Sequence, residues 1–387
     1  MFFRFCVTTI TAILMSACVS TAQDPNIPTQ QLLDDSVFPA YPSFTIETEQ
    51  QVFALNDAAR AFVDQVIGEH KEQKAQIKAL ANSIFDRSDF NLLYRASANT
   101  VASETFDNRA ANCLSMSIMT YSLAEYAGFR SRMQDIEIPE YWTRRDGFSL
   151  LNGHVNVLIE PVELSSNVIR FVTSETVVDF DPQESRRHFP VNVITRAKTL
   201  AMFYNNKGAD ALMDGSYSKA YAYFRAAAKT VPDFDSPWVN LGILYRRAGY
   251  SNLAEIAYER AIEVDSENLT AWENLAFLYA HEGQETLAQS IMRRVEKRRQ
   301  DNPFYHFILG EQAFDAGKID QALIYYRSAY RLDSSRHEVL FGLSKVYYEM
   351  GNVNRSVKFM QLAKKHSPNP QEENRYQGKL SKLQQAI

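Results

Sequence analysis

Residues 235–268 read DSPWVNLGILYRRAGYSNLAEIAYERAIEVDSEN, and the spacing of large and small residues in this stretch recurs every 34 residues. The fourth position of each unit is large and the eighth is small. The twentieth is small and the twenty-fourth is aromatic or Met. The units begin near Ala201, Asp235, Leu269, Pro303 and His337. Because small residues let helices approach closely and large ones fill the space beside them, the period predicts a stack of helix pairs.

The period and the pattern resemble the tetratricopeptide repeat, in which helix pairs stack into an all-α solenoid. The resemblance implies five repeats over residues 197–368 and a capping helix over residues 369–387. The first helix of each repeat would line a concave face that binds a protein or an extended peptide. The candidate contact residues on that face are Ile243, Phe277, Phe307, Phe314, Phe341 and Tyr348. The alternative is that these side chains pack against the domain that precedes the repeats.

A second informative stretch lies upstream, at residues 112–117, which read Asn-Cys-Leu-Ser-Met-Ser and open an apolar segment that reaches Gly128. Glycine commonly ends a helix, so the segment is expected to be helical. A cysteine at the N-terminus of a helix gains from the macrodipole and from unpaired backbone N–H groups, which stabilise its thiolate. The same N–H groups could hold an oxyanion. Cys113 is therefore a candidate nucleophile, and the alternative is a buried, unreactive thiol.

Strands are expected at four places after this helix: residues 129–138, 154–160, 168–172 and 176–180. Residues 139–153, between the first two strands, are expected to form a loop. The arginines of this loop, Arg144 and Arg145, are expected to be solvated charges, with recognition of a carboxylate as the alternative. One helix followed by several strands indicates an α+β domain.

Thiol chemistry needs a thiolate, a base beside it and a group that orients the base. Cys113, His154 and an aspartate meet this need if the strands that carry the histidine and the aspartate pair antiparallel behind the helix. Two aspartates qualify, Asp179 and Asp181. Side chains alternate along a strand, so both aspartates lie on one face and the pattern does not choose between them. Taken alone, His154 is more often a structural histidine.

The order of these residues resembles the transglutaminase-like superfamily, which has a papain-like α+β fold. Members carry the nucleophilic Cys at a helix start, the His at a strand start and an Asp in a following strand, often before Pro. Asn112-Cys113, Gly153-His154 and Asp181-Pro182 match these three places. The resemblance covers about residues 47–190 and implies a transglutaminase-like domain over residues 47–196.

The resemblance also implies a cysteine hydrolase or transamidase that acts on a peptide or amide bond. Cys113 would attack the carbonyl, and His154 would serve first as base and then as acid. Asp181, with Asp179 as the alternative, would hold the imidazole tautomer. Asn112 is the candidate donor to the oxyanion. The sequence shows no cluster of metal-ligand residues, and neither a metal nor a cofactor is expected.

The first 18 residues resemble a signal peptide, with one basic residue followed by an apolar run. Met15-Ser16-Ala17-Cys18 resembles a bacterial lipobox, in which Cys18 would be lipidated; simple cleavage is the alternative. Residues 19–46 are polar and contain several prolines, which is typical of a tether. These features imply a protein on the periplasmic side of the bacterial cell envelope, attached by lipid to the outer membrane.

The overall composition narrows the function classes. A net charge of -5 over 387 residues argues against nucleic-acid binding, because such proteins normally carry a basic face. The length is sufficient for two domains, each with its own core. The leading hypothesis is an exported thiol enzyme whose repeats bind a protein. The rival hypothesis is an envelope scaffold in which the repeats bind a partner and the front domain is catalytically silent.

Overall fold

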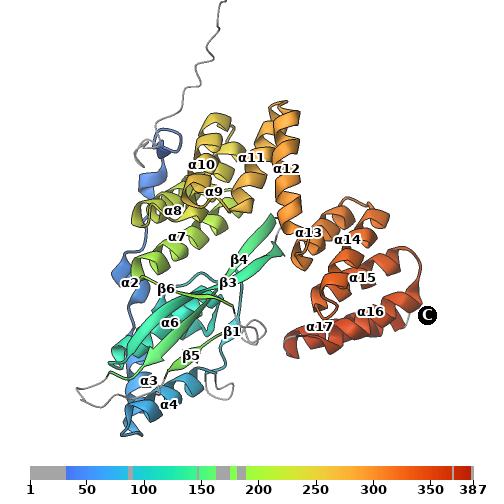
Figure 1. Ribbon diagram of the computed structural model, residues 1–387. Coiled ribbons are helices and arrows are strands. Elements are labelled where there is room, and N and C mark those ends of the chain that lie inside the picture. Colours follow the sequence, from blue (N-terminus) through green and yellow to red (C-terminus); the bar gives the residue numbers. More distant parts are fainter. Residues whose placement is uncertain are drawn as a thin grey trace, which may run out of the picture.

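The computed structural model describes six stretches of the chain: residues 32–85, 90–145, 148–162, 175–180, 189–367 and 370–384 (Figure 1). A small sheet with helices against it forms the front domain, and a series of helix pairs forms the second part of the molecule (Figure 1). The signal peptide predicted for residues 1–18, with Cys18, lies outside the described residues. Among the helices that are described, none is both long and apolar enough to cross a membrane.

The front domain combines helices with two sheets. Its elements in chain order are η1 (Tyr41–Ser43), α2 (Glu49–Phe53), α3 (Asp57–Gly68), α4 (Gln73–Phe85), β1 (Leu93–Tyr94), α5 (Ala102–Asn108), β2 (Ala110–Ala111), α6 (Cys113–Tyr126), β3 (Arg130–Arg145), β4 (Phe148–Glu160), β5 (Thr176–Val178) and β6 (Val191–Ile194). Four strands form an antiparallel sheet in the order β5-β4-β3-β6, while β1 and β2 form a parallel pair. The strand before Asp179 therefore lies beside the strand that carries His154.

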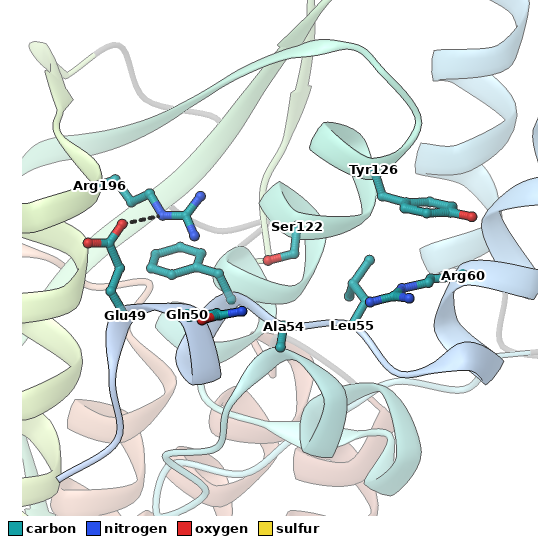
Figure 2. Close-up of a pocket in the computed structure, with 9 residues that line it drawn as sticks. Glu49, Gln50, Ala54, Leu55, Arg60, Ser122, Tyr126 and Arg196 are labelled. Atoms are coloured by element: carbon teal, nitrogen blue, oxygen red, sulfur yellow. Dashed lines mark ion pairs between the residues drawn. The ribbon is translucent and has the colours of Figure 1, made fainter.

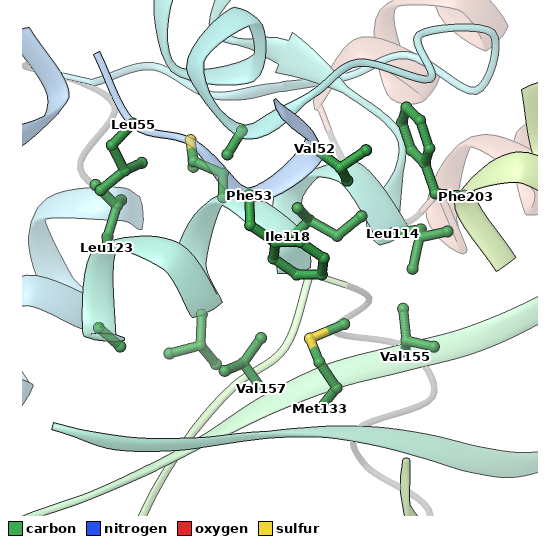
Figure 3. Close-up of a cluster of buried hydrophobic side chains, with 14 of the residues drawn as sticks. Val52, Phe53, Leu55, Leu114, Ile118, Leu123, Met133, Val155, Val157 and Phe203 are labelled. Carbon is green, nitrogen blue, oxygen red and sulfur yellow. The ribbon is translucent and has the colours of Figure 1, made fainter. Parts of the chain in front are cut away.

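Helix α6 lies at the centre of the front domain's core. Most of its residues are buried, and a helix that is apolar on all sides belongs inside a protein. Residues that line this core include Leu114, Ile118, Leu123, Met133 and Val157 (Figure 3). The helix begins at Cys113 and ends at Tyr126, two residues before Gly128. The φ of Gly128 is 78°, a conformation that favours glycine and terminates the helix.

The segment predicted to be a loop, residues 139–153, is instead strand over its described parts: residues 139–145 belong to β3 and residues 148–153 to β4. The ladder is interrupted by a register shift between Ile136 and Tyr141 and then resumes. Pro139 lies within this interruption, where a residue without a backbone N–H costs no ladder hydrogen bond. An irregularity of this kind lets a strand continue past a proline. His154 consequently lies inside β4 and not at the start of a strand.

Within the described residues, the array contains five helix pairs followed by one more helix. Its elements are α7 (Arg196–Met213), α8 (Tyr217–Thr230), α9 (Asp235–Arg247), α10 (Ser251–Val264), α11 (Leu269–His281), α12 (Glu285–Arg299), α13 (Pro303–Asp315), α14 (Ile319–Leu332), α15 (His337–Glu349), α16 (Val353–Lys365) and α17 (Pro370–Gln384). Small and aromatic positions of the repeat face each other, as at Gly242 and Tyr258. A Cβ atom added to Gly242 would lie 2.4 Å from the tyrosine ring, so the helices approach as closely as the pattern predicts.

The packing of the array changes between α12 and α13. The buried core of the first three repeats reaches Ala288 in α12, and a separate core begins at Ala313 in α13. The outer end of the β3–β4 hairpin reaches the array at this place (Figure 1). The buried cluster formed there consists of Trp142, Phe304, Tyr305 and Ile308. One hairpin of the front domain is thus built into the array.

Part of the segment predicted to be a tether, residues 19–46, is docked on the first two repeats. Leu33 and Phe38 are buried in the core of those repeats. The carboxylate of Asp35 accepts two hydrogen bonds from Arg225, at 2.7 and 2.9 Å. The tether prediction missed this docking because the segment has no helical or strand period, and its contacts are made with residues far along the chain.

Candidate active site

Cys113 is the first residue of α6, directly after the residue that caps the helix. Oδ1 of Asn112 accepts a hydrogen bond from the backbone N–H of Ser115 at 2.9 Å. The cap therefore satisfies one of the N–H groups that the first turn leaves unpaired. Cys113 is half-buried, and it forms no disulfide within the described residues. Its place in the first turn is where the helix dipole most favours an anion.

His154 and Asp179 form a buried polar contact. Nε2 of His154 lies 3.0 Å from Oδ2 of Asp179, and the two side chains are 4% and 12% exposed. The antiparallel pairing of β4 with β5 brings them together. With Nε2 at the carboxylate, Nδ1 is the ring nitrogen that could take a proton from a thiol. Asp181, which the family resemblance favours, lies outside the described residues.

A third polar residue, Asn156, lies beside this pair and was not predicted. Its Nδ2 donates to Oδ2 of Asp179 at 3.3 Å, and only 6% of the residue is exposed. Its Oδ1 is buried and has no hydrogen-bond partner within the described residues. Residues two apart in a strand share a face, so the spacing from His154 to Asn156 is the signal that could have identified it. Asn156 restricts the orientation of the Asp179 carboxylate.

The head of α6 lies against the part of β4 that carries His154. Oγ of Ser117, one turn after Cys113, donates to the backbone carbonyl of Val155 at 3.5 Å. Leu114 and Val155 are buried in the same hydrophobic core. Helix α6 and the strand that carries the candidate base therefore pack against each other at Val155, the residue after His154.

The side chain of Asn112, the candidate oxyanion donor, is engaged within the protein. Its Nδ2 donates to Oδ1 of Asn99, and Asn99 donates in turn to Asp210 of α7. Arg145 also donates to Asp210, and its side chain is only 22% exposed. The expectation that Arg145 is a solvated loop charge is wrong, because β3 carries it onto α7. One N–H of Asn112 is used in this way, and backbone N–H groups at the α6 head are further candidate donors to an oxyanion.

The candidate contact residues of the array differ in exposure. Phe277 and Tyr348 are 50% and 49% exposed and can meet a partner. Ile243 and Phe307 are half-buried at the edges of hydrophobic cores. Phe307 also packs against the cluster around Trp142, which corresponds to the alternative that array aromatics contact the front domain.

The remaining two candidates, Phe314 and Phe341, lie on either side of one lysine. The Lys345 ammonium group is 4.7 Å from the Phe314 ring centroid and 5.5 Å from that of Phe341. It donates to both carboxylate oxygens of Glu311, at 2.8 and 2.9 Å. Phe341 also packs on Tyr376 of α17, with the ring centroids 5.5 Å apart. The chain itself therefore covers part of this face.

The hairpin is held by the two helices between which it lies. Arg299 at the end of α12 is 1% exposed and donates to both carboxylate oxygens of Glu140, at 2.6 and 2.7 Å. It also donates to Glu273 at 2.9 Å. Burial alone would lower the pKa of Arg299, and the two carboxylates outweigh that effect and raise it. Asn302, which caps α13, donates to the backbone carbonyl of Glu140 at 2.8 Å.

A hollow of about 570 Å³ lies toward the other end of α6 (Figure 2). Its lining includes Tyr126 from the last turn of α6 and Arg196 from the start of α7. Arg196 pairs with Glu49 at 2.7 Å, and its guanidinium group lies 4.1 Å from the ring centroid of Phe53. Because Cys113 is at the first turn of the helix, this hollow is separate from the candidate site.

Comparison with known proteins identifies the array. Residues 236–268 match the family model of the tetratricopeptide repeat, TPR. The array is a TPR solenoid. Solenoids of this kind present an extended concave surface suited to binding a protein or a peptide. The prediction of TPR repeats from the 34-residue period is confirmed.

Several solved structures are similar to the chain. YrrB, described as a TPR protein with an unusual peptide-binding site, is 16% identical, with 46% of this chain and 92% of YrrB covered and a TM-score of 0.26. PilF of Pseudomonas aeruginosa is 16% identical, with 49% and 87% covered and a TM-score of 0.31. MamA from Desulfovibrio magneticus RS-1 is 17% identical, with 42% and 94% covered and a TM-score of 0.26. No curated protein matches the chain.

Proposed function

We propose that the protein is an exported thiol enzyme of the transglutaminase-like type, in which Cys113 attacks a peptide or amide carbonyl and the TPR array binds a protein. The observation that carries the proposal is the buried contact of His154, on the strand β4 that packs against α6, with Asp179, the residue directly after β5. An imidazole held by a carboxylate at one nitrogen has a fixed tautomer and is stabilised when it gains a proton. A cysteine nucleophile at the head of α6 needs a base of this kind.

In the proposed reaction, His154 takes the proton of the Cys113 thiol, and the thiolate sulfur adds to the carbonyl carbon. N–H groups at the α6 head hold the resulting oxyanion. The imidazolium then gives its proton to the departing amine nitrogen, and the C–N bond breaks to leave a thioester. Water or a second amine adds to the thioester with His154 as base, the C–S bond breaks to release a carboxylic acid or a new amide, and the Cys113 sulfur regains the proton from His154. Asp179 holds the imidazole, with Asp181 as the other candidate.

The proposal includes export and lipid attachment. It is supported by the signal-peptide-like residues 1–18 and by the lipobox-like sequence that ends at Cys18. A lipid on Cys18 would hold the protein on the periplasmic side of the bacterial outer membrane. The array would then bring a protein substrate to Cys113 or hold a complex at the membrane. Phe277 and Tyr348 are the expected contacts, because they are the most exposed of the candidate residues.

The test is the rate at which iodoacetamide alkylates Cys113 as a function of pH. Mass spectrometry of the peptide that contains Cys113 isolates its signal from those of Cys6 and Cys18 in the full chain. We expect the midpoint of the rate profile to lie well below the value of about 8.5 typical of a thiol. The midpoint should rise in His154→Ala, which lacks the base, and in Asp179→Asn, which lacks its partner.

Two further variants complete this test. Asp181→Asn compares the two aspartates, because only the orienting carboxylate should shift the profile in the same direction as His154→Ala. His306→Ala is the matched histidine control, since His306 lies on α13 and its Nε2 is 2.8 Å from the backbone carbonyl of Gln300. A profile that is the same in the wild type and in His154→Ala contradicts the thiol enzyme.

A binding scaffold is the second candidate function, favoured by the family match on a repeat of the array. In that case the front domain supports the array through the β3–β4 hairpin, and Cys113 is an inert thiol. Phe277→Ala and Tyr348→Ala would weaken binding of the partner protein, whereas Cys113→Ala would leave both the partner complex and the cellular phenotype unchanged. A phenotype of Cys113→Ala that equals deletion of the protein would exclude the silent front domain.

A further inference from the structure

We propose that Asp210, on α7 in the first repeat, is a positioning residue for the Cys113 site. Its carboxylate fixes the orientation of two buried side-chain amides that lead to the cap of α6. The inference rests on the proposed function in one respect only, namely that the reactivity of Cys113 matters. The contact between the two domains then belongs to the proposed active site as well as to the architecture.

Three hydrogen bonds connect Asp210 with α6, and all run in the same direction. Asn99 Nδ2 donates to Oδ2 of Asp210, and Asn112 Nδ2 donates to Oδ1 of Asn99. The backbone N–H of Ser115 then donates to Oδ1 of Asn112 at 2.9 Å. Asn99 and Asn112 are 9% and 8% exposed, so solvent does little to replace these bonds. We call Asp210, Asn99 and Asn112 the amide relay.

The carboxylate sets the direction of the relay because it can only accept hydrogen bonds. A side-chain amide can turn over and exchange its donor and acceptor ends. Asn99 must present its NH₂ group to Asp210, so its carbonyl oxygen faces Asn112. Asn112 must then present its NH₂ group to Asn99, which leaves its own oxygen for the N–H of Ser115. The orientation of the helix cap is therefore determined by a charge in the repeat array.

The second oxygen of Asp210 accepts from a different donor. Arg145, near the outer end of β3, donates to Oδ1 of Asp210. The side chains of Arg145 and Asp210 are 22% and 25% exposed, so the pair is partly shielded from water. A residue that replaces Asp210 must accept from Arg145 as well as from Asn99. An asparagine cannot accept at both of these oxygen positions, because its amide has a donor NH₂ group in place of one oxygen.

The consequence for Cys113 follows from its place in the chain. Cys113 is the residue after Asn112 and lies in the first turn that Asn112 caps. If Asn112 turned over, its NH₂ group would face the N–H of Ser115, and the first turn would lose its cap. The thiol would then leave the position in which the helix dipole and the backbone N–H groups of the first turn stabilise its anion.

The test uses Asp210→Asn, Asn112→Asp and the double variant in the full chain. Asp210→Asn keeps the shape of the side chain, yet it forces either the relay to reverse or Arg145 to lose its acceptor. We expect the alkylation rate of the Cys113 peptide at neutral pH to fall by up to about fivefold, the factor that corresponds to losing the stabilisation of an anion at a helix N-terminus. The rate is measured well below the unfolding temperature. Asp214→Asn, an exposed change at the C-cap of the same helix, should leave it unchanged.

The double variant provides the rescue. In it, the new carboxylate at position 112 accepts from both Ser115 and a reversed Asn99. The new amide at position 210 donates to Asn99 while its oxygen accepts from Arg145. Every group again has a matching partner, so the thermal unfolding midpoint should be higher in the double variant than in either single variant. If these residues serve packing alone, the decreases in unfolding midpoint caused by Asp210→Asn and Asn112→Asp should add in the double variant. Additive losses, or an alkylation rate in Asp210→Asn equal to that of the wild type, would overturn the proposal.

The outcomes also separate this inference from the proposed function. If His154→Ala leaves alkylation of Cys113 unchanged while the double variant shows rescue, the amide relay exists and the thiol enzyme does not. If His154→Ala shifts the profile while the single losses add, the enzyme stands and Asp210 has no positioning role.

Discussion

Two junctions of the TPR array show how differently neighbouring repeats are joined. Between α14 and α15, the ring of Tyr326 packs directly against Gly342, where an added Cβ would lie 2.5 Å from the ring. Between α12 and α13, the hairpin of the front domain contributes Trp142 and Glu140 to the contact. The 34-residue period continues through both junctions. The shared 34-residue period therefore determines how the two helices of one repeat pack together. The packing between neighbouring repeats also depends on residues from other parts of the chain, such as the β3–β4 hairpin.

The hairpin-filled junction is expected to show the largest effect of a single substitution. Arg299→Met removes a buried cation and leaves Glu140 and Glu273 without their partner, which should lower the free energy of unfolding by about 3 kcal/mol. The neighbouring Arg298→Met is the matched control. Arg298 is 54% exposed and pairs with Glu267 at the surface, so its loss should cost less than about 1 kcal/mol. Chemical denaturation measures both, and equal losses would show that the hairpin adds nothing to the junction.

The direct junction is expected to be sensitive to an added methyl group. Tyr326 lies between Gly310 and Gly342, so its ring cannot move away from a new Cβ on either side. Gly342→Ala should therefore lower the free energy of unfolding by about 2 kcal/mol through overpacking. Gly378→Ala in α17 is the control, because the new Cβ has open space around it. This substitution should raise the free energy of unfolding by up to about 1 kcal/mol. A stabilising Gly342→Ala would contradict the close approach of these helices.

The docked segment before the front domain offers the smallest effect, and it depends on pH. Burial raises the pKa of Asp35, but hydrogen bonds from Arg225, Tyr221 and Tyr41 outweigh burial and lower it. A depressed folded-state pKa means that the contribution is present above the unfolded value of about 3.9 and is lost as pH falls through the folded value. Asp35→Asn should lower stability at pH 7 by less than about 1 kcal/mol, because Asp35 is 43% exposed.

This difference between Asp35→Asn and the wild type should begin to shrink as the pH falls below about 4, and it should disappear below the depressed folded-state pKa of Asp35, where the wild-type carboxylate is protonated too. Denaturation curves of both proteins, recorded from about pH 7 to about pH 2.5, would measure how this stability difference depends on pH. Asp233→Asn is the control, because Asp233 is 88% exposed and its contact with Arg260 is 3.4 Å long. A difference that persists undiminished in acid would mean that the ionic bonds of Asp35 do not hold the docked segment.

The candidate active site, like the junctions, combines features that local sequence patterns predict with contacts that only tertiary packing creates. Cys113 at the start of a helix, and the strand pairing that brings an aspartate to His154, follow from local patterns and chain order. Asn156 could have been found from its spacing in β4. Asn99 and Asp210 could not, because they meet only when α7 packs beside the front domain. No pattern within either segment marks that contact.

The sequence by itself determined the helix pairs of the array, the start and end of α6, and the alternation of side chains between the two faces of each strand. Each of these depends on residues within one turn, one strand or one repeat, where spacing along the chain translates directly into neighbours in space. The tertiary structure alone decided that residues 139–145 of β3 extend to the array, that Arg299 binds Glu140, and that Asp210 reaches the cap of α6. Those contacts join residues far apart in the chain, and their partners are selected by shape and charge after the local elements have formed.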